Sequence, residues 1–195
     1  MKSVTADKAL AALREEIIEF IPKNSNLLDV GSATGDLLFK ASHKIGFGIG
    51  VDLDLAMIEF ARGKKRELKS ENIEFFHADI NRFEKLSEYK IDIATATLCL
   101  HEMQEEDVLE TLKTMAAISS KIVIADYEKA QTLSSKFFME FDEVISSHYV
   151  RFREYRNRGY FPYLAKRAGL QIVNEQKSTI DGIVIWELNG NKFAE

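Results

Sequence analysis

The chain has 195 residues, of which 46% are hydrophobic and 29% charged, and its formal net charge is −5. This length suits one globular domain, and the composition excludes a collagen-like, coiled-coil or disordered chain. The acidic balance makes nucleic acid an unfavourable default partner, because neutralising phosphates requires a cationic surface. The single cysteine, Cys99, allows no internal disulfide. With no signal peptide or membrane-spanning stretch in the sequence, we expect a cytoplasmic protein.

Hydrophobic periodicity predicts the elements in chain order. Apolar residues at helical spacing predict helices over 6–21, 34–43, 54–68 and 105–117. Short apolar runs predict strands over 26–30, 47–51, 73–77, 91–96 and 121–125. A further helical stripe runs over 133–148, and two more strands, 172–179 and 183–188, are joined at Asp181-Gly182, which is a strong hairpin signal.

This alternation predicts the fold class, an α/β, Rossmann-like doubly wound sheet. Strands that alternate with helices pair in parallel, and their right-handed crossovers cover both faces of the sheet. The closing hairpin is expected to add one antiparallel strand at an edge. No repeat or low-complexity segment divides the chain, so we expect a single domain over 1–195.

The most informative stretch is the glycine turn within Leu28–Asp36, between the first strand and the next helix. Gly31 and Gly35 let the backbone turn sharply, and the helix that follows points unpaired N–H groups at the same place. Asp52 ends the second strand, where an acid can accept hydrogen bonds from ribose hydroxyls. This combination predicts a nucleotide-type ligand, whereas two glycines alone would be ordinary loop residues.

The dinucleotide fingerprint G-x-G-x-x-G fails here, because it meets Ala33 and then Asp36 where glycines are needed. A negative side chain at Asp36 disfavours a pyrophosphate. A ligand with a carboxylate, an amino group and a ribose but no phosphate suffers less, and S-adenosylmethionine (SAM) has that composition.

The segment Leu27–Gly35 resembles the first motif of class I SAM-dependent methyltransferases of the small-molecule type, similar to ubiquinone and menaquinone methyltransferases. The resemblance continues through segments 50–57, 77–80, 91–92 and 100–103, over roughly the first two thirds of the chain. Many members have glycine where this chain has Ala33, and we expect the extra methyl group to be tolerated. The resemblance also implies a sheet that ends in an antiparallel hairpin.

By position, the resemblance implies the residues that bind SAM. Around its methionine end it implies Asp29, Gly31, Ser32, Ala33 and Gly35. For the ribose and adenine it implies Asp52, Leu53, Met57, Asp79 and Ile80, and near the sulfonium Thr97. Taken singly, Met57 and Ile80 are equally well read as core residues, and Asp79 as a helix cap.

Methyl transfer to a hydroxyl or an acidic carbon needs a base. His101, close after the fourth strand, is the candidate for a base or a substrate contact; its alternative is a structural histidine packed against helix 105–117. Cys99 lacks the Pro-Cys context of covalent pyrimidine methylation and is better read as a buried thiol. Four scattered histidines and one cysteine give no metal-ligand spacing, so no metal is expected.

The segment 148–167 interleaves aromatic residues with six cations against one carboxylate. In the family, the insertion before the sixth strand often covers the active site, so a lid over about 127–168 is implied. Its candidate substrate contacts are Tyr127, His148, Arg151 and Tyr155, although His148 also fits an apolar stripe. The segment could instead bind RNA, or be a solvated helix face with a few core aromatics.

We therefore predict a SAM-dependent methyltransferase that acts on a small-molecule acceptor by direct displacement and releases S-adenosylhomocysteine. Two alternatives remain: an RNA or protein methyltransferase that uses segment 148–167, and a SAM-binding partner protein without catalysis.

Overall fold

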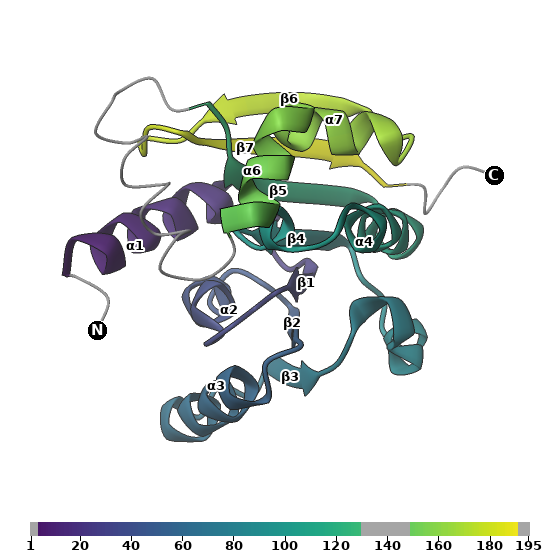
Figure 1. Ribbon diagram of the computed structural model, residues 1–195. Helices are drawn as coiled ribbons and strands as arrows, with labels where there is room; N and C mark the ends of the chain where they lie inside the picture. Colours follow the sequence, from purple (N-terminus) through teal and green to yellow (C-terminus); the bar gives the residue numbers. More distant parts are fainter. Residues whose placement is uncertain (1–3, 130–148, 191–195) are drawn as a thin grey trace.

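The computed structural model describes residues 4–129 and 149–190, and these form a three-layered α/β structure (Figure 1). The strands are β1 (Asn26–Val30), β2 (Phe47–Asp52), β3 (Ile73–His77), β4 (Ile93–Thr97), β5 (Lys121–Tyr127), β6 (Ile172–Lys177) and β7 (Ile183–Asn189). The α-helices are α1 (Val4–Glu19), α2 (Asp36–Ala41), α3 (Leu55–Leu68), α4 (Glu105–Ile118), α6 (Tyr149–Arg158) and α7 (Tyr160–Arg167). Three short 3₁₀ helices, η1 (Ile80–Arg82), η2 (Glu84–Glu88) and η3 (Leu100–Glu102), lie in the connections.

The sheet has the order β3-β2-β1-β4-β5-β7-β6. The first five strands along this order pair in parallel, and β7 pairs antiparallel with both β5 and β6. The predicted doubly wound fold with a closing hairpin is therefore confirmed. One detail differs, because the antiparallel strand β7 lies between β5 and β6 instead of at the edge. Its residues Ile183–Leu188 are mostly buried, whereas β6 is exposed along most of its length, which explains why the apolar strand takes the inner place.

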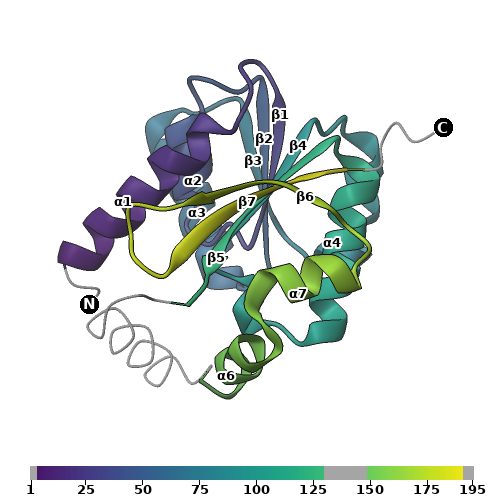
Figure 2. The ribbon, with the colours of Figure 1, turned by 90° about the horizontal axis from the view of Figure 1, so that it is seen from above.

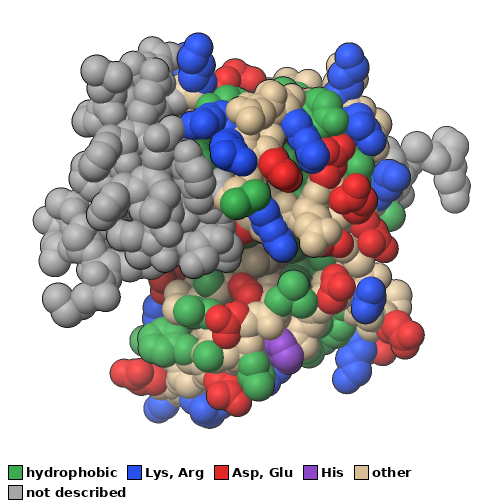
Figure 3. All heavy atoms as spheres, viewed as in Figure 1, with side chains coloured by type: hydrophobic (Ala, Val, Ile, Leu, Met, Phe, Trp, Pro, Cys, Tyr) green, Lys and Arg blue, Asp and Glu red, His purple; other side chains and the backbone are tan. Residues whose placement is uncertain are grey.

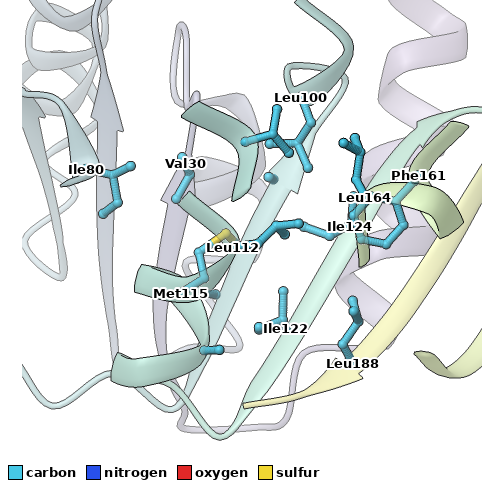
Figure 4. Packing of buried hydrophobic residues seen from close by; sticks show 14 of the residues in the cluster. Val30, Ile80, Leu100, Leu112, Met115, Ile122, Ile124, Phe161, Leu164 and Leu188 are labelled. Carbon is cyan, nitrogen blue, oxygen red and sulfur yellow. The ribbon is translucent and has the colours of Figure 1, made fainter. Parts of the chain in front are cut away.

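Helices cover both faces of the sheet, with α1, α2 and α3 on one side and α4 and α7 on the other (Figure 2). Alternate residues of β5 show why: Ile122 and Ile124 belong to one buried cluster, and Val123 and Ala125 to the other. The period-2 alternation of a strand thus sends apolar side chains into two cores. In the first core, Leu112 and Met115 of α4 and Phe161 and Leu164 of α7 meet the sheet residues Ile122, Ile124 and Leu188 (Figure 4).

Several predicted bounds shift for local reasons. Helix α2 begins at Asp36, because Gly35 has φ 75° and cannot belong to the helix. Helix α3 begins after Asp54, whose side chain accepts from the N–H groups of Ala56 and Met57 as an N-cap. Segment 149–167 forms two helices separated at Gly159, which has φ 105°. The predicted helix 133–148, with its candidate His148, lies outside the described residues.

Candidate active site

A cavity of about 730 Å³ opens at the carboxyl ends of the parallel strands. The strand order reverses between β1 and β4, which is where open α/β sheets bind ligands. The connections after β1, β2, β3 and β4 all contribute to its lining, together with α1, β5 and α6. Figure 3 shows the molecule hollowed near the middle of this face.

The glycine loop, residues 31–35, forms one wall of the cavity. Gly31 has φ 69°, and a Cβ there would lie 2.8 Å from Cys99 Sγ. Gly35 has φ 75°, and a Cβ there would lie 2.4 Å from Cζ of Phe75. Both glycines are therefore required by their backbone angles and by close neighbours. Gly31 lines the cavity, whereas Gly35 lies outside the lining and closes the turn, its N–H donating to Ser32 O at 2.8 Å.

Two other residues of the lining have left-handed backbone without being glycine. Ala33 has φ 45° and Leu98, in the connection after β4, has φ 51°. Such conformations cost roughly 1–2 kcal/mol per residue and concentrate at functional sites. Ala33 adopts this left-handed conformation. Glycine adopts it more readily, which explains a preference for glycine at this position.

Asp52 fixes the glycine loop from the neighbouring strand. Its Oδ2 accepts from the N–H of Ala33 at 2.8 Å, and its Oδ1 from the N–H of Asp54 at 2.8 Å. The carboxylate lines the cavity and remains half-buried. Since each carboxylate oxygen can accept more than one hydrogen bond, Asp52 can bind ligand hydroxyls while it holds the loop.

Carboxylates dominate the charge of the cavity. The acidic lining residues are Asp29, Asp36, Asp52, Asp79, Glu102 and Asp107, and the basic ones are Arg14 and Arg151. Asp36 forms ion pairs with Arg14 at 3.4 Å and with Lys64 at 2.6 Å. Burial favours its neutral form, but the hydrogen bond from Lys64 and the charge of Arg14 outweigh burial and lower its pKa. Because two cations offset Asp36, its repulsion of a pyrophosphate is weaker than the sequence indicates.

Asp29 is the most perturbed of these acids. It is 3% exposed, and burial raises its pKa to about 7 although Thr95 Oγ1 donates to its Oδ1 at 2.8 Å. A carboxyl that is costly to ionise at the wall of a cavity is a functional-site signal. A cationic ligand would favour its charged form.

Two hydroxyls of the lining are buried without a hydrogen-bond partner among the described residues: Ser32 Oγ and Thr97 Oγ1. Buried polar atoms are nearly always paired in folded proteins, so an orphaned hydroxyl at a cavity wall indicates a ligand. These hydroxyls, the glycine cradle and the acidic lining together fit SAM, which carries a sulfonium, an ammonium and a ribose.

At the other end of the cavity, His101 of η3 lies against the end of β5. It is 2% exposed, and its Nδ1 lies 2.5 Å from Oδ1 of Asp126, which is itself fully buried. The backbone N–H of His101 also donates to Asp126 Oδ2, at 3.2 Å. His101 therefore pairs with a carboxylate of β5. The alternative from the sequence, a structural histidine packed against helix 105–117, does not include this partner.

Segment 148–167 contributes less to the cavity than its sequence indicates. Arg151 lines it, and its Nη1 donates to the carbonyl of Glu102 at 2.8 Å. Arg158 and Arg167 instead form ion pairs with Glu105 in the first turn of α4. Tyr155 is buried outside the lining and donates to the carbonyl of Tyr127 at 2.9 Å. These contacts agree with the structural alternative for part of the segment.

The cavity brings most of the predicted residues together. Those in the lining are Asp29, Gly31, Ser32, Ala33, Asp52, Leu53, Asp79, Ile80, Thr97, His101, Tyr127 and Arg151. Those outside it are Gly35, Met57 and Tyr155. Asp79 is also the N-cap of η1, accepting from Asn81 N at 3.0 Å, and Ile80 is also a core residue, as their structural alternatives predicted; their contact with a cofactor stays a prediction.

Sequence reasoning missed several lining residues, notably Arg14, Asn81 and Asp107. Arg14 comes from α1, which precedes every motif, and its only signal is a charge beside the apolar face of Leu13 and Ile17. Cys99 fits the expected inert thiol: burial and nearby carboxylates raise its pKa, and it donates to the carbonyl of Val30 at 3.5 Å.

Within residues 4–129 and 149–190, no three His, Cys, Asp or Glu side chains are grouped as metal ligands. None of the described helices is long and apolar enough to cross a membrane.

Comparison with known proteins identifies the family. The profile of a family described as "Methyltransferase domain" matches residues 21–169. No curated protein matches the chain significantly.

Three solved structures share the fold at low identity. The PH0226 protein of Pyrococcus horikoshii is 14% identical over 97% of this chain and 92% of its own, with a TM-score of 0.72. Magnesium protoporphyrin IX methyltransferase of Synechocystis, solved with bound SAM, is 12% identical over 97% and 86%, with a TM-score of 0.67. A SAM-dependent methyltransferase of Aquifex aeolicus is 14% identical over 90% and 88%, with a TM-score of 0.60.

The family match covers the glycine loop, Asp52, His101 and most of the cavity wall, and the three solved structures share the overall fold. The chain belongs to the methyltransferase domain family, and its fold is that of class I SAM-dependent methyltransferases.

Proposed function

We propose that this enzyme methylates a small molecule held at the acceptor end of the cavity, which we define as His101, Glu102, Tyr127 and Arg151. The observation that carries this proposal is the continuity of one cavity of about 730 Å³ from the glycine loop to these four residues. Pockets for small ligands are commonly of this volume. We further infer that α6, through Arg151, acts as the lid over this end within a single domain.

The cofactor end of the cavity consists of the connections after β1, β2 and β3. There Asp29 and Arg14 would bind the ammonium and the carboxylate of the methionine part, since they are the buried acid and the cation beside the glycine loop. Asp52 would accept from the ribose hydroxyls, and Asp79 and Ile80 would contact the adenine. Met57 lies outside the lining, so Leu53 is the better candidate for the second adenine contact.

Two polar groups of the chain are suited to the sulfonium. Thr97 Oγ1 and Ser32 Oγ belong to residues of the lining and are buried without a hydrogen-bond partner among the described residues. When bound, SAM supplies an activated methyl group that bonds to the acceptor as its bond to sulfur breaks, the electron pair remaining on sulfur. The chain itself supplies orientation in a pocket shielded from water, and orientation alone can account for roughly 7–11 kcal/mol of barrier.

The alternative of an RNA or protein substrate has less support. A macromolecular docking face needs cations that are open to the partner. Arg158 and Arg167 are paired with Glu105, and Arg151 donates to a backbone carbonyl. The alternative of a binding protein without catalysis does not account for a cavity that extends past the cofactor end to a buried histidine.

The test is transfer of a radiolabelled methyl group from SAM into a cell extract, which is then separated into small-molecule, lipid, RNA and protein pools. We expect label in the small-molecule or lipid pool. Label in RNA or protein would contradict the proposal, and tight SAM binding without label in any pool would favour the non-catalytic alternative. The Asp52→Ala variant is the matched control, because it retains the acceptor end and should transfer less label.

A further inference from the structure

We propose that Asp126 is a positioning residue: it holds the His101 ring so that Nε2 can take the proton of a hydroxyl acceptor. This inference rests on the proposed function and names the class of acceptor for the same site. Asp126 does not line the cavity, so it would act through His101.

The pairing follows from the topology. Strands β4 and β5 are parallel neighbours, and the register Thr97↔Ala125 places the residues just after β4 beside the last residues of β5, which include Asp126. The N–H of Leu98 donates to the carbonyl of Ala125 at 2.8 Å, which fixes the two strand ends together. η3 begins three residues beyond β4 and presents His101 to Asp126.

Three donors surround the Asp126 carboxylate. Oδ1 lies 2.5 Å from His101 Nδ1 and accepts from the N–H of Tyr127 at 2.8 Å, while Oδ2 accepts from the N–H of His101 at 3.2 Å. A carboxylate only accepts hydrogen bonds, so the ring must donate from Nδ1, and its lone pair is then on Nε2. Fixing the tautomer through the second ring nitrogen is how a buried acid prepares a histidine base.

Carboxylates lie close to both nitrogens of the ring. Nε2 lies 3.8 Å from Oε1 of Glu102, so an imidazolium would have a carboxylate near each nitrogen. The Tyr127 ring lies 4.7 Å from the His101 ring, and the Tyr155 ring lies 6.2 Å from it. Among the described residues that line the cavity, Cys99 and Arg151 are further titratable or charged groups from the elements around His101.

The step that this pair serves is a balanced proton and methyl transfer. The acceptor O–H bond breaks, its proton goes to Nε2 of His101, and the oxygen forms the new bond to the methyl carbon. Sulfur keeps the electron pair of the broken methyl–sulfur bond. A neutral amine already has a nucleophilic lone pair and does not need a base before attack, so a prepared base indicates an acceptor that must lose a proton, a hydroxyl or an acidic carbon. Of these two we propose the hydroxyl, because an O–H group can donate a hydrogen bond to Nε2 before the proton is transferred.

The first readout needs no acceptor. Nitrogen NMR of histidine-labelled protein, at a pH where the ring is neutral, reports which nitrogen carries the proton; the His101→Gln variant identifies the His101 signals among the four histidines. We expect the proton on Nδ1 in the wild type. In Asp126→Asn the side-chain amide can donate to Nδ1, so we expect the proton to move to Nε2. A wild-type ring protonated on Nε2 would overturn the inference without any variant.

The second readout is the pH profile of methyl transfer into the small-molecule pool. We expect Asp126→Asn to lower the neutral-pH rate at least about a hundredfold, and the deficit to shrink at alkaline pH, where the acceptor hydroxyl ionises unaided. His101→Gln should show the same profile. A deficit that is equal at every pH would mean that Asp126 only maintains structure, and would contradict the inference.

SAM affinity, measured by calorimetry, distinguishes the loss of a positioning residue from misfolding of the variant. Asp126→Asn should bind SAM within about twofold of the wild type, because the residue lies outside the lining. Ser119→Ala is the matched control: Ser119 is fully buried, donates to the carbonyl of Met115 and caps α4 before β5 begins, at the opposite end of that strand from Asp126. If the wild type labels RNA or protein, the proposed function fails, while the NMR experiment still decides the role of Asp126.

Discussion

The two ends of the cavity are built by different means. At the cofactor end, backbone angles and the hydrogen bond from Ala33 to Asp52 set the geometry of one strand-turn-helix-strand unit, and Cys99 and Phe75 pack against its two glycines. At the acceptor end, side chains from distant segments meet, as His101 does with Asp126, and Arg151 with the carbonyl of Glu102. The cofactor end is therefore a rigid unit that tolerates little substitution, whereas the acceptor end can change with few consequences for folding.

The largest effect that tests this difference between the two ends of the cavity is expected at Gly35. In Gly35→Ala the new Cβ would lie 2.4 Å from the buried Phe75 ring in a left-handed backbone. Overpacking and backbone strain together should lower the free energy of unfolding by about 3–5 kcal/mol, measured by urea denaturation.

Gly63→Ala is the matched control for Gly35→Ala. Gly63 lies within α3, and the atom nearest to its new Cβ would be Arg66 Nη2 at 3.9 Å. A better helix former there should stabilise the protein by about 0.5–1 kcal/mol. Similar effects of the two substitutions would show that the glycine loop is not the rigid unit described above.

Asp29→Asn should separate stability from cofactor binding. The unfolded carboxyl ionises near 3.8 and the folded one near 7, so the folded state binds the extra proton between these values. Wild-type stability thus falls as pH rises from 4 to 7, and the variant, which has no such proton, should gain at most about 4 kcal/mol relative to it at pH 8. Its SAM affinity should be at least about tenfold weaker, since a charge-assisted hydrogen bond is lost.

Denaturation of both proteins at pH 4.5 and pH 8 tests this prediction. The stability difference between Asp29→Asn and the wild type should be larger at pH 8. A difference that is the same at both pH values would contradict the raised pKa of Asp29.

The sequence predicts the cofactor end well because its signals are local. Gly31 and Gly35 stand in one turn, and Asp52 ends the next strand, so chain order alone brings them together. Arg14 could not be found this way, because nothing local shows that α1 reaches the cavity. The pair of His101 and Asp126 was within reach, since His101 follows β4 and Asp126 lies near the end of its parallel neighbour β5, but the sequence does not show which residue at the end of β5 faces His101.

The same reasoning applies to the sheet edge. A hairpin can place either of its strands against β5, and its turn at Asp181-Gly182 does not distinguish them. The composition does: Ile183–Trp186 is continuously apolar, whereas Asn174–Lys177 is polar, and the buried inner position takes the apolar strand. The apolar content of the two strands therefore indicates which of them lies next to β5.

Asp52→Ala tests the cofactor end with a smaller effect. Loss of charge-assisted hydrogen bonds, worth roughly 1.5–3 kcal/mol each, should weaken SAM binding at least about tenfold in calorimetry. Asp54→Ala is the matched control, because Asp54 caps α3 from outside the lining and should cost about 1 kcal/mol of stability without changing SAM affinity. Unchanged affinity in Asp52→Ala would rule out its contact with the ribose.

Ala33→Gly is the smallest and sharpest test, because it should improve the protein. Ala33 has φ 45°, so glycine removes about 1–2 kcal/mol of strain. Glycine also costs about 0.5–1 kcal/mol because it raises the conformational entropy of the unfolded chain, which leaves a net gain of up to about 1.5 kcal/mol. Ala61→Gly, in the middle of α3, is the matched control and should lose about 1 kcal/mol. SAM affinity should stay within about twofold, because Ala33 donates to Asp52 through its backbone, which glycine preserves. A destabilised Ala33→Gly variant would mean that the loop relies on the alanine methyl, and that side-chain packing sets the geometry at the cofactor end as it does at the acceptor end.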